Sequence, residues 1–115
     1  MITLTLPFPP STNTYYRNVA GETLISAKGR SYRKAVADQV LIQRGAKLLA
    51  GRLSVSIVAH MPDKRRRDLD NMLKAALDSM THAGVWVDDS QIDILTIQRA
   101  PVGGMLKVSV SEVLA

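Results

Sequence analysis

The amino-acid sequence predicts a single α+β domain spanning residues 1–115, with a small mixed β-sheet layered against two main helices. A chain of 115 residues is long enough for one domain with its own core. Alternating apolar and polar residues indicate strands at 2–6, 53–59 and 106–110, and helical spacing indicates helices near 27–49 and 69–80. With a further strand at 92–97, the predicted order is β-α-β-α-β-β.

The first predicted strand ends in a proline-rich loop. Apolar residues alternate with threonines over 2–6, and prolines at 7, 9 and 10 stop the strand. Tyr15 and Tyr16 then stand beside Arg17. Both rings have the chemistry to stack on a base or sugar, but packing against the core is the better explanation for at least one of them.

Ser26 is a suitable cap for the first predicted helix, which runs from about Ala27 to Leu49. Apolar residues within it fall at helical spacing, at positions 32, 35, 36 and 40. Its first turns hold four cations with no acid between them: Lys28, Arg30, Arg33 and Lys34. A second contact to phosphate and an ordinary solvated helix face explain this cluster equally well.

The second half of the chain begins with a strand that leads into its most highly charged stretch. His60 closes this strand, and we interpret it as a solvent-facing residue or hydrogen-bond partner, not as a catalytic base. The next helix carries an apolar stripe over 69–80, and Gly84 is expected to stop it. The last run, 106–110, is expected to form a hairpin with the strand at 92–97 across the turn at 101–104.

The charged stretch combines four consecutive cations, 64–67, with two aspartates that follow at once, Asp68 and Asp70. A surface built only to hold an anion does not need the acids, which would partly neutralise it. Carboxylate oxygens suit hard divalent cations such as Mg²⁺, whereas arginine and lysine suit phosphate. The stretch therefore indicates a site that holds a phosphate backbone and also presents carboxylates to a metal.

Composition points in the same direction. Fifteen lysines and arginines against ten acids give a net charge of +5, and the charge is clustered, so nucleic acid is the expected partner class. There is no cysteine, which excludes disulfides and thiolate metal sites and suits a reducing cytoplasm. His60 and His82 are too few and too isolated for a zinc site, and no apolar run is long enough to span a bilayer.

Each acid also has a purely structural explanation. Asp68 is a candidate helix cap, and Asp70 is placed to favour the positive end of the helix dipole or to pair with Lys74 four residues on. Asp88 and Asp89 are typical turn residues. What favours a shared site is that all these groups converge if the strand after Asp89 lies beside the strand before residue 64.

The residues of the charged stretch resemble a known family. Residues 61–71, Met-Pro-Asp-Lys-Arg-Arg-Arg-Asp-Leu-Asp-Asn, followed by Lys74, Asp78, the segment 84–89 and Gln91, look like the RusA-type Holliday-junction resolvases of bacteria and their phages. The opening 6–11, Leu-Pro-Phe-Pro-Pro-Ser, with Asn13 and Tyr16, resembles the start of that family. The similarity covers nearly the whole chain, although Leu77 stands where some members carry an aromatic residue.

This resemblance implies a homodimeric endodeoxyribonuclease that depends on Mg²⁺, with Mn²⁺ as a substitute, and resolves four-way DNA junctions by paired symmetric nicks in recombination and repair. It implies a bacterial or phage origin and a cytoplasmic location. The implied catalytic residues are Asp68, Asp70, Asp89 and Lys74, with the three aspartates as metal ligands and Asp88 as a weaker match. We assign DNA binding to Lys64, Arg65, Arg66, Arg67 and Asn71.

The rival hypothesis is a basic DNA-binding protein without catalysis, in which the acids are only caps and turns. The nuclease hypothesis carries a geometric expectation that the rival lacks. Side chains two apart on a helix point to different faces, whereas along an extended segment they share one. We therefore expect the chain to be non-helical through Asp68, regular helix to begin at about 69–71, and Asp70 to turn toward Asp68 and Asp89 beneath Lys74.

Overall fold

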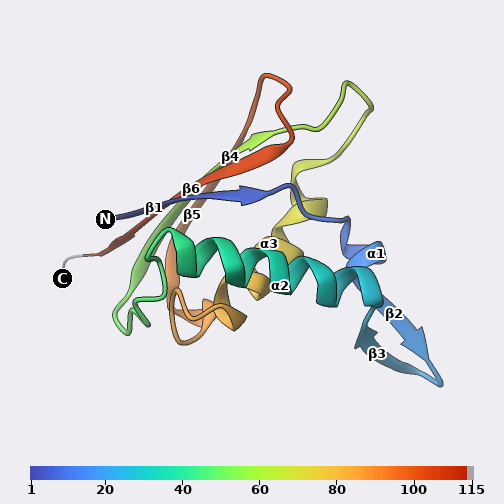
Figure 1. Cartoon of the computed structure of the whole chain (residues 1–115), viewed down its shortest axis with the longest axis horizontal. Coiled ribbons are helices and arrows are strands. Elements are labelled where there is room, and N and C mark those ends of the chain that lie inside the picture. Colours follow the sequence, from blue (N-terminus) through green and yellow to red (C-terminus); the bar gives the residue numbers. More distant parts are fainter. Residues whose placement is uncertain (114–115) are drawn as a thin grey trace.

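The computed structural model describes residues 1–113 and has the expected α+β architecture (Figure 1). The strands are β1 (Ile2–Pro7), β2 (Tyr16–Val19), β3 (Glu22–Ile25), β4 (Leu53–His60), β5 (Ile92–Ala100) and β6 (Met105–Glu112). The helices are α1 (Thr12–Tyr15), α2 (Ala27–Ile42) and α3 (Leu73–His82), with 3-10 turns η1 (Leu69–Met72) and η2 (Asp89–Gln91). The predicted elements are present, and α1, the β2–β3 hairpin and the two 3-10 turns are additional.

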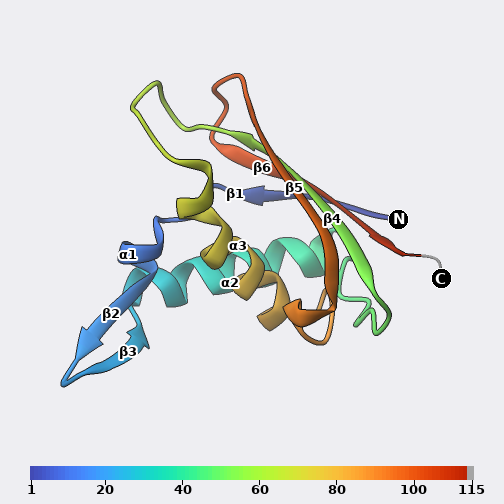
Figure 2. The same cartoon turned by 180° about the vertical axis from the view of Figure 1, so that it is seen from behind.

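The main sheet is mixed, as predicted, with strand order β1-β6-β4-β5 (Figure 2). β4 and β5 are parallel, and β6 runs antiparallel to both β4 and β1. The expected hairpin between β5 and β6 is wrong, because β4 lies between these strands. The short connection passes over the end of β4, where the amides of Gly103 and Gly104 donate to the Met61 and His60 carbonyls, each at 2.9 Å.

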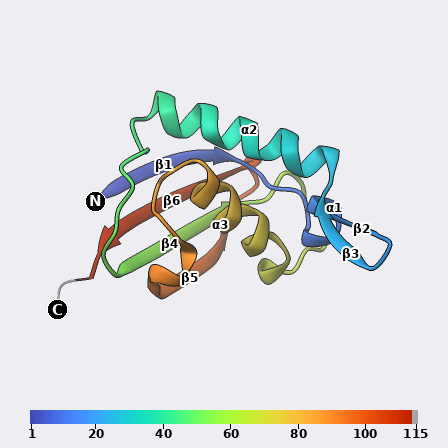
Figure 3. The ribbon, with the colours of Figure 1, turned by 90° about the horizontal axis from the view of Figure 1, so that it is seen from below.

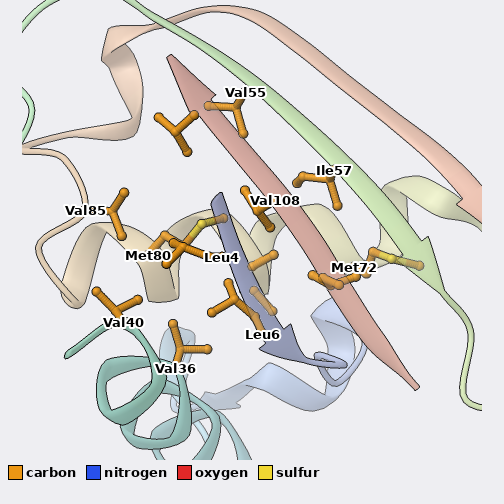
Figure 4. Packing of buried hydrophobic residues seen from close by; sticks show 14 of the residues in the cluster. Leu4, Leu6, Val36, Val40, Val55, Ile57, Met72, Met80, Val85 and Val108 are labelled. Carbon is orange, nitrogen blue, oxygen red and sulfur yellow. The ribbon is translucent and has the colours of Figure 1, made fainter. Parts of the chain in front are cut away.

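Both long helices cover the same face of the main sheet (Figure 3), and the core lies between these layers. Alternate residues of the two inner strands, β4 and β6, and of the edge strand β1 point into it, and Trp86 is its largest fully buried side chain. Figure 4 shows Val36 and Val40 of α2 and Met80 of α3 packed against Leu4 and Leu6 of β1. Of the stripe predicted on the second helix, Met72, Ala76 and Met80 are buried and the three leucines are partly buried. Within residues 1–113, no helix is long and apolar enough to cross a membrane.

The ends of the two long helices were predicted with different success. Gly84, with φ of 83°, follows α3 as expected, and the Val85 amide donates to the Met80 carbonyl at 3.1 Å. α2 ends at Ile42, seven residues before the predicted end at Leu49. It is closed by the same type of cap, in which Arg44 takes the left-handed conformation with φ of 60° and the Gly45 amide donates to the Val40 carbonyl at 2.7 Å.

Gly29, in the first turns of α2, allows that helix to lie against the backbone of α1. A Cβ atom at this position would clash with the Tyr15 carbonyl oxygen and lie 2.8 Å from Ile25 Cγ2. We expect Gly29→Ala to lower the free energy of unfolding by about 1–3 kcal/mol, the usual cost of overpacking, in urea unfolding. Ser31→Ala, at an exposed position of the same helix, is the control, expected within about 0.5 kcal/mol of wild type. An unchanged midpoint for Gly29→Ala would contradict this close packing.

Candidate nucleic-acid and metal site

The loop between β4 and η1 is organised by Asp63. Its carboxylate pairs with Arg67 at 2.5 Å and with Arg65 at 3.0 Å, and it also accepts from the Arg65 amide at 2.9 Å. The side-chain hydrogen bonds from Arg67 and then Arg65 hold the pKa of Asp63 well below its usual range. The four consecutive cations are therefore not equivalent, because two of them are turned toward an acid within their own loop.

Arg67 points inward and is only 23% exposed. Its guanidinium carbon lies 5.9 Å from the centre of the Phe8 ring, and its carbonyl oxygen accepts from Arg99 Nη2 at 2.7 Å. Lys64 and Arg66 are exposed and form no ion pair with any residue in 1–113. Of the cationic run, these two are thus the most available to a phosphate backbone.

The chain is extended at Asp68, with φ of −89° and ψ of 138°, as predicted. The 3-10 turn η1 begins at Leu69, within the expected range, and regular α-helix follows only from Leu73. Asp68 stands at the N-cap position of η1 but caps no amide with its side chain, and Asp70 forms no ion pair with Lys74 within residues 1–113. Asp70 does lie in the first turn of η1, where the helix-dipole explanation places it. Asp68, Asp70 and Lys74 are all exposed.

The first turns of α3 continue as a charged stripe, since Asp70, Lys74 and Asp78 are spaced four apart. Asp78 is the structural member of the stripe: Arg33 Nη2 contacts it at 2.7 Å, and the Tyr15 hydroxyl donates to it. Arg33 Nε also donates to the Tyr15 oxygen at 2.9 Å. Tyr15 is fully buried, which confirms that at least one of the two tyrosines packs in the core.

The basic cluster at the start of α2 is largely occupied by contacts within the fold. Arg33 belongs to the Asp78 network, Arg30 Nη1 donates to the Ile25 carbonyl at 2.9 Å, and Lys34 pairs with Asp38 at 3.3 Å. Lys28 is exposed. These contacts favour a structural explanation of the cluster over a second phosphate site.

Asp88 has the structural role of a cap on the turn η2, in line with the expectation that Asp88 and Asp89 form a turn. Its carboxylate accepts from the Ser90 amide at 3.1 Å, while the Gln91 side-chain oxygen accepts from the Asp88 amide at 2.8 Å. Gln91 is itself buried and donates to the Leu49 and Gly51 carbonyls, at 2.9 and 2.8 Å. The turn is therefore anchored in the body of the protein and presents Asp89 to solvent.

Asp89 lies in an electrostatically unfavourable position. Burial, a hydrogen bond with the Asp88 side chain and the Asp88 charge all raise the pKa of Asp89. Lys74 acts in the opposite direction, and Asp78 adds a smaller increase. Lys74 and Asp89 are therefore close enough to influence one another, and a cation placed beside Asp89 would relieve the excess negative charge.

The three acids do not converge to the extent expected. β5 does lie beside β4, but the strands are parallel, so η1 follows the end of β4 while η2 precedes the start of β5, with α3 between them (Figure 3). Residues 1–113 contain no group of three or more acids or histidines arranged to hold a metal ion. Lys74 and Asp78 stand on α3, between the two acid-bearing turns.

The structure also shows the role of His60 and a small cavity beside the charged stretch. His60 Nδ1 shares a hydrogen bond with the Pro101 carbonyl at 2.8 Å, which agrees with its interpretation as a hydrogen-bond partner. A small cavity of about 80 Å³ lies where the proline-rich loop meets the charged stretch, and it is lined by Phe8, Arg67, Asp68 and Asn71, among others.

The sequence did not indicate the contact made by Arg99 or the organising role of Asp63, because both depend on contacts formed only after folding.

A cationic loop that leads directly into exposed carboxylates, on a small α+β domain, is typical of proteins that process nucleic-acid backbones. Comparison with known proteins makes this class specific. Residues 7–111 match the family model described as endodeoxyribonuclease RusA. The chain is 46% identical over 114 residues to the crossover junction endodeoxyribonucleases RusA of Enterobacteria phage 82, Escherichia coli K12 and Shigella sonnei, covering 95% of this chain and 92% of each relative. The chain belongs to the RusA endodeoxyribonuclease family.

The raised pKa of Asp89 predicts how its replacement affects stability. The fold disfavours the ionised carboxylate, so Asp89→Asn should stabilise the protein at pH 7, where Asp89 is ionised in both folded and unfolded chains. The gain should shrink as the pH falls through the range just above the ordinary aspartate value of about 4 and vanish below it. Thermal unfolding from pH 3.5 to 7, without divalent ions, measures this.

Asp93→Asn is the matched control, because Arg52 lowers the pKa of Asp93 through a side-chain hydrogen bond. The expected change in stability has the opposite sign: Asp93→Asn should destabilise the protein at pH 7. This loss of stability should shrink as the pH falls through the lowered pKa of Asp93. If both variants moved stability in the same direction at pH 7, the assigned environment of Asp89 would be wrong.

Proposed function

We propose that this protein is a divalent-metal-dependent endonuclease that resolves four-way DNA junctions by paired symmetric nicks, in recombination and repair. The observation that carries the proposal is the exposed pair Asp68 and Asp70 directly after a cationic loop, in a member of a family whose relatives are named crossover junction endodeoxyribonucleases. The phage and bacterial sources of these relatives support action in a bacterial cytoplasm.

The donor set suits Mg²⁺, with Mn²⁺ as a substitute. Mg²⁺ is commonly held by only one or two carboxylates, with waters and substrate phosphates completing its shell, so a three-residue protein cage is not required. Asp68, just before η1, and Asp70, within it, would supply ligands, and Asp89, whose ionised form is disfavoured, would supply one from η2. When bound, the ion lowers the pKa of a water and offsets charge on the phosphate.

Lys74 is the residue best placed to act beside these acids. It is exposed, stands on α3 one turn beyond Asp70, and is near enough to Asp89 to lower the pKa of that carboxyl. Its ammonium group has three donors to orient the attacking water or to offset the negative charge that develops on the phosphate. We assign it that role.

DNA would be held through its backbone. Lys64 and Arg66 offer free charge, Arg65 and Arg67 lie on either side of Asp63, and Asn71 in η1 adds an amide next to Asp70. These are phosphate contacts, which position DNA without reading its sequence. In the alternative, a DNA-binding protein without catalysis, the acids would be caps and turns. Asp88 fits that description fully, whereas Asp68 caps no amide and neither Asp68 nor Asp70 forms an ion pair within residues 1–113.

Replacing the acids separates the two functions. Asp70→Asn and Asp89→Asn should each lower the rate of junction cleavage by roughly 100-fold or more, because the metal supplies several kcal/mol of transition-state stabilisation. Junction binding should stay equal or tighten, since a negative charge facing the backbone is removed. Cleavage and gel-shift assays on a synthetic four-way junction measure both, with Asp38→Asn, an exposed acid on α2, as the control.

Calorimetric titration of Mn²⁺ into each variant tests whether one ion is shared. Loss of the same binding event in Asp70→Asn and Asp89→Asn would indicate a common ion, and loss of different events would indicate two. A wild-type protein that binds junctions but does not cut them with Mg²⁺ or Mn²⁺ would support the non-catalytic alternative.

The two-fold symmetry of the proposed substrate, a four-way junction, also predicts the oligomeric state of the protein. A four-way junction with two-fold symmetry requires two matched nicks, and a chain with one set of acids supplies them as a homodimer. The edge strand β5 supports this, because it exposes Ile94 at 50% and Leu95 at 39% and has one unpaired side in the main sheet. We propose that a second copy pairs along this edge.

Ile94→Lys should convert the dimer to monomer in analytical ultracentrifugation at micromolar concentration, because the lysine charge would be desolvated in the interface. Thr3→Lys is the control, since it places the same charge at an exposed position on β1, the opposite edge of the sheet. A dimeric Ile94→Lys would exclude this edge, and a wild type that is monomeric with and without DNA would contradict the homodimer itself.

A further inference from the structure

A polar groove lies between α1 and the β2–β3 hairpin and has no role in the functions described so far. It has a volume of about 450 Å³ and is lined by Thr12, Asn13, Tyr16, Arg17, Asn18 and Thr23. Every lining side chain carries a hydrogen-bonding group, and none is a carboxylate. Figure 2 shows the hairpin extending from the body of the protein on the side where η1 meets α1.

The groove is joined directly to the candidate site. Thr12 Oγ1 donates to the Asn71 carbonyl at 3.0 Å, which ties its floor to η1, the turn that carries Asp70. Tyr16 lies close enough to Asp78 and Asp89 for both charges to raise the pKa of its hydroxyl, beyond the larger effect of burial. A nucleic-acid strand bound over Asp70 and Asp89 could therefore extend into this groove along one continuous surface.

The hairpin is rigid enough to act as a recognition element. Its two strands pair in register from Tyr16–Ile25 to Val19–Glu22, and a two-residue turn, Ala20 and Gly21, closes it with φ of 52° and 83°. Tyr16 is held edge-to-face against the buried Tyr15, with ring centres 4.8 Å apart. Its half-buried ring is thus supported on one side by the core and keeps a part of its surface exposed to the groove.

The chemistry of the lining fits one deoxynucleotide. Arg17 supplies a cation for a phosphate, the Tyr16 ring offers a surface for stacking, and the amides of Asn13 and Asn18 match the donor and acceptor pattern of a base edge. The Thr23 hydroxyl donates to Asn18 Oδ1 at 3.1 Å, which orients that amide and leaves its nitrogen to meet a ligand. A peptide partner would more commonly find apolar anchors or acid partners for Arg17, and neither lines the groove.

We propose that this groove takes one unpaired nucleotide of the strand next to the cleaved phosphate and reads its base, so that Asn13, Tyr16 and Asn18 set the nucleotide preference of the cut. The inference rests on the proposed junction-cleaving function and adds to it a specificity site. Bases at the crossover of a junction are the easiest to unpair, which limits the cost of placing one in the groove.

The first test compares cleavage of four junctions that differ only in the nucleotide beside one cut position. The wild type should prefer one nucleotide, and Asn18→Ala should reduce the ratio of best to worst rate by roughly fivefold, the discrimination that one base-edge hydrogen bond from the Asn18 nitrogen provides. Junction affinity should change less than about twofold. Val19→Ala is the matched control, because Val19 is an exposed residue of the same strand that does not line the groove.

The second test does not require cleavage. A junction carrying 2-aminopurine at the same position is titrated with protein in EDTA. Stacking on Tyr16 should quench the fluorescence, Tyr16→Leu should remove the quenching, and Val19→Ala should keep it. A wild type without nucleotide preference, or variants that leave preference and quenching unchanged, would overturn the proposal. If the wild type cut no junction, the proposed function would fail, whereas quenching that depends on Tyr16 would still support the groove.

Discussion

The parallel pairing of β4 with β5 is the constraint on which the arrangement of the site depends. Two parallel neighbours cannot be joined by a tight turn, so the chain must cross back over the sheet, and α3 makes that crossing. The crossing places one 3-10 turn before α3 and another after it. The helix that returns the chain is therefore also the surface between the two acid-bearing turns, and its exposed stripe carries Lys74.

The polar network centred on Asp78 fixes the N-terminal segment to this helix. Asp78 is 30% exposed and Arg33 24%, so both charges are partly desolvated and depend on one another and on Tyr15 for hydrogen bonds. The three residues come from α3, α2 and α1 respectively. The groove at the hairpin and the acids at η1 are thus attached to the same group of helices, although they are far apart in the sequence.

What could be predicted from the sequence depended on how local its cause was. Gly84 after an apolar stripe, Ser26 before α2 and the extended backbone at Asp68 are determined within a few residues, and each was predicted correctly. The end of α2 was placed too late because Arg44, a residue that seldom adopts positive φ, occupies the position that glycine usually fills. The β5–β6 hairpin was wrongly predicted because a short loop was taken to join neighbours.

At the candidate site, too, features with a local cause were predicted and features that depend on long-range pairing were not. The charged residues were evident from the sequence, but the pairing of β4 with β5 entered only as a condition for convergence. The parallel direction of β5, and with it the separation of η1 from η2, was not predicted. Nor did the sequence show that Asp63 restrains two of the four cations. The β2–β3 hairpin went undetected because its strands bury little and show no apolar alternation, so that only the Ala20–Gly21 turn marks it.

That low burial has an evolutionary consequence. Between Arg17 and Leu24 every hairpin residue is exposed, so substitutions there remove little packing and leave the core and the acids of η1 and η2 untouched. Changes in the core or in the acids affect stability or chemistry, whereas the exposed residues 17–24 can change with little effect on either. Exchanging residues 17–24 between relatives would therefore change the proposed nucleotide groove while leaving the core in place.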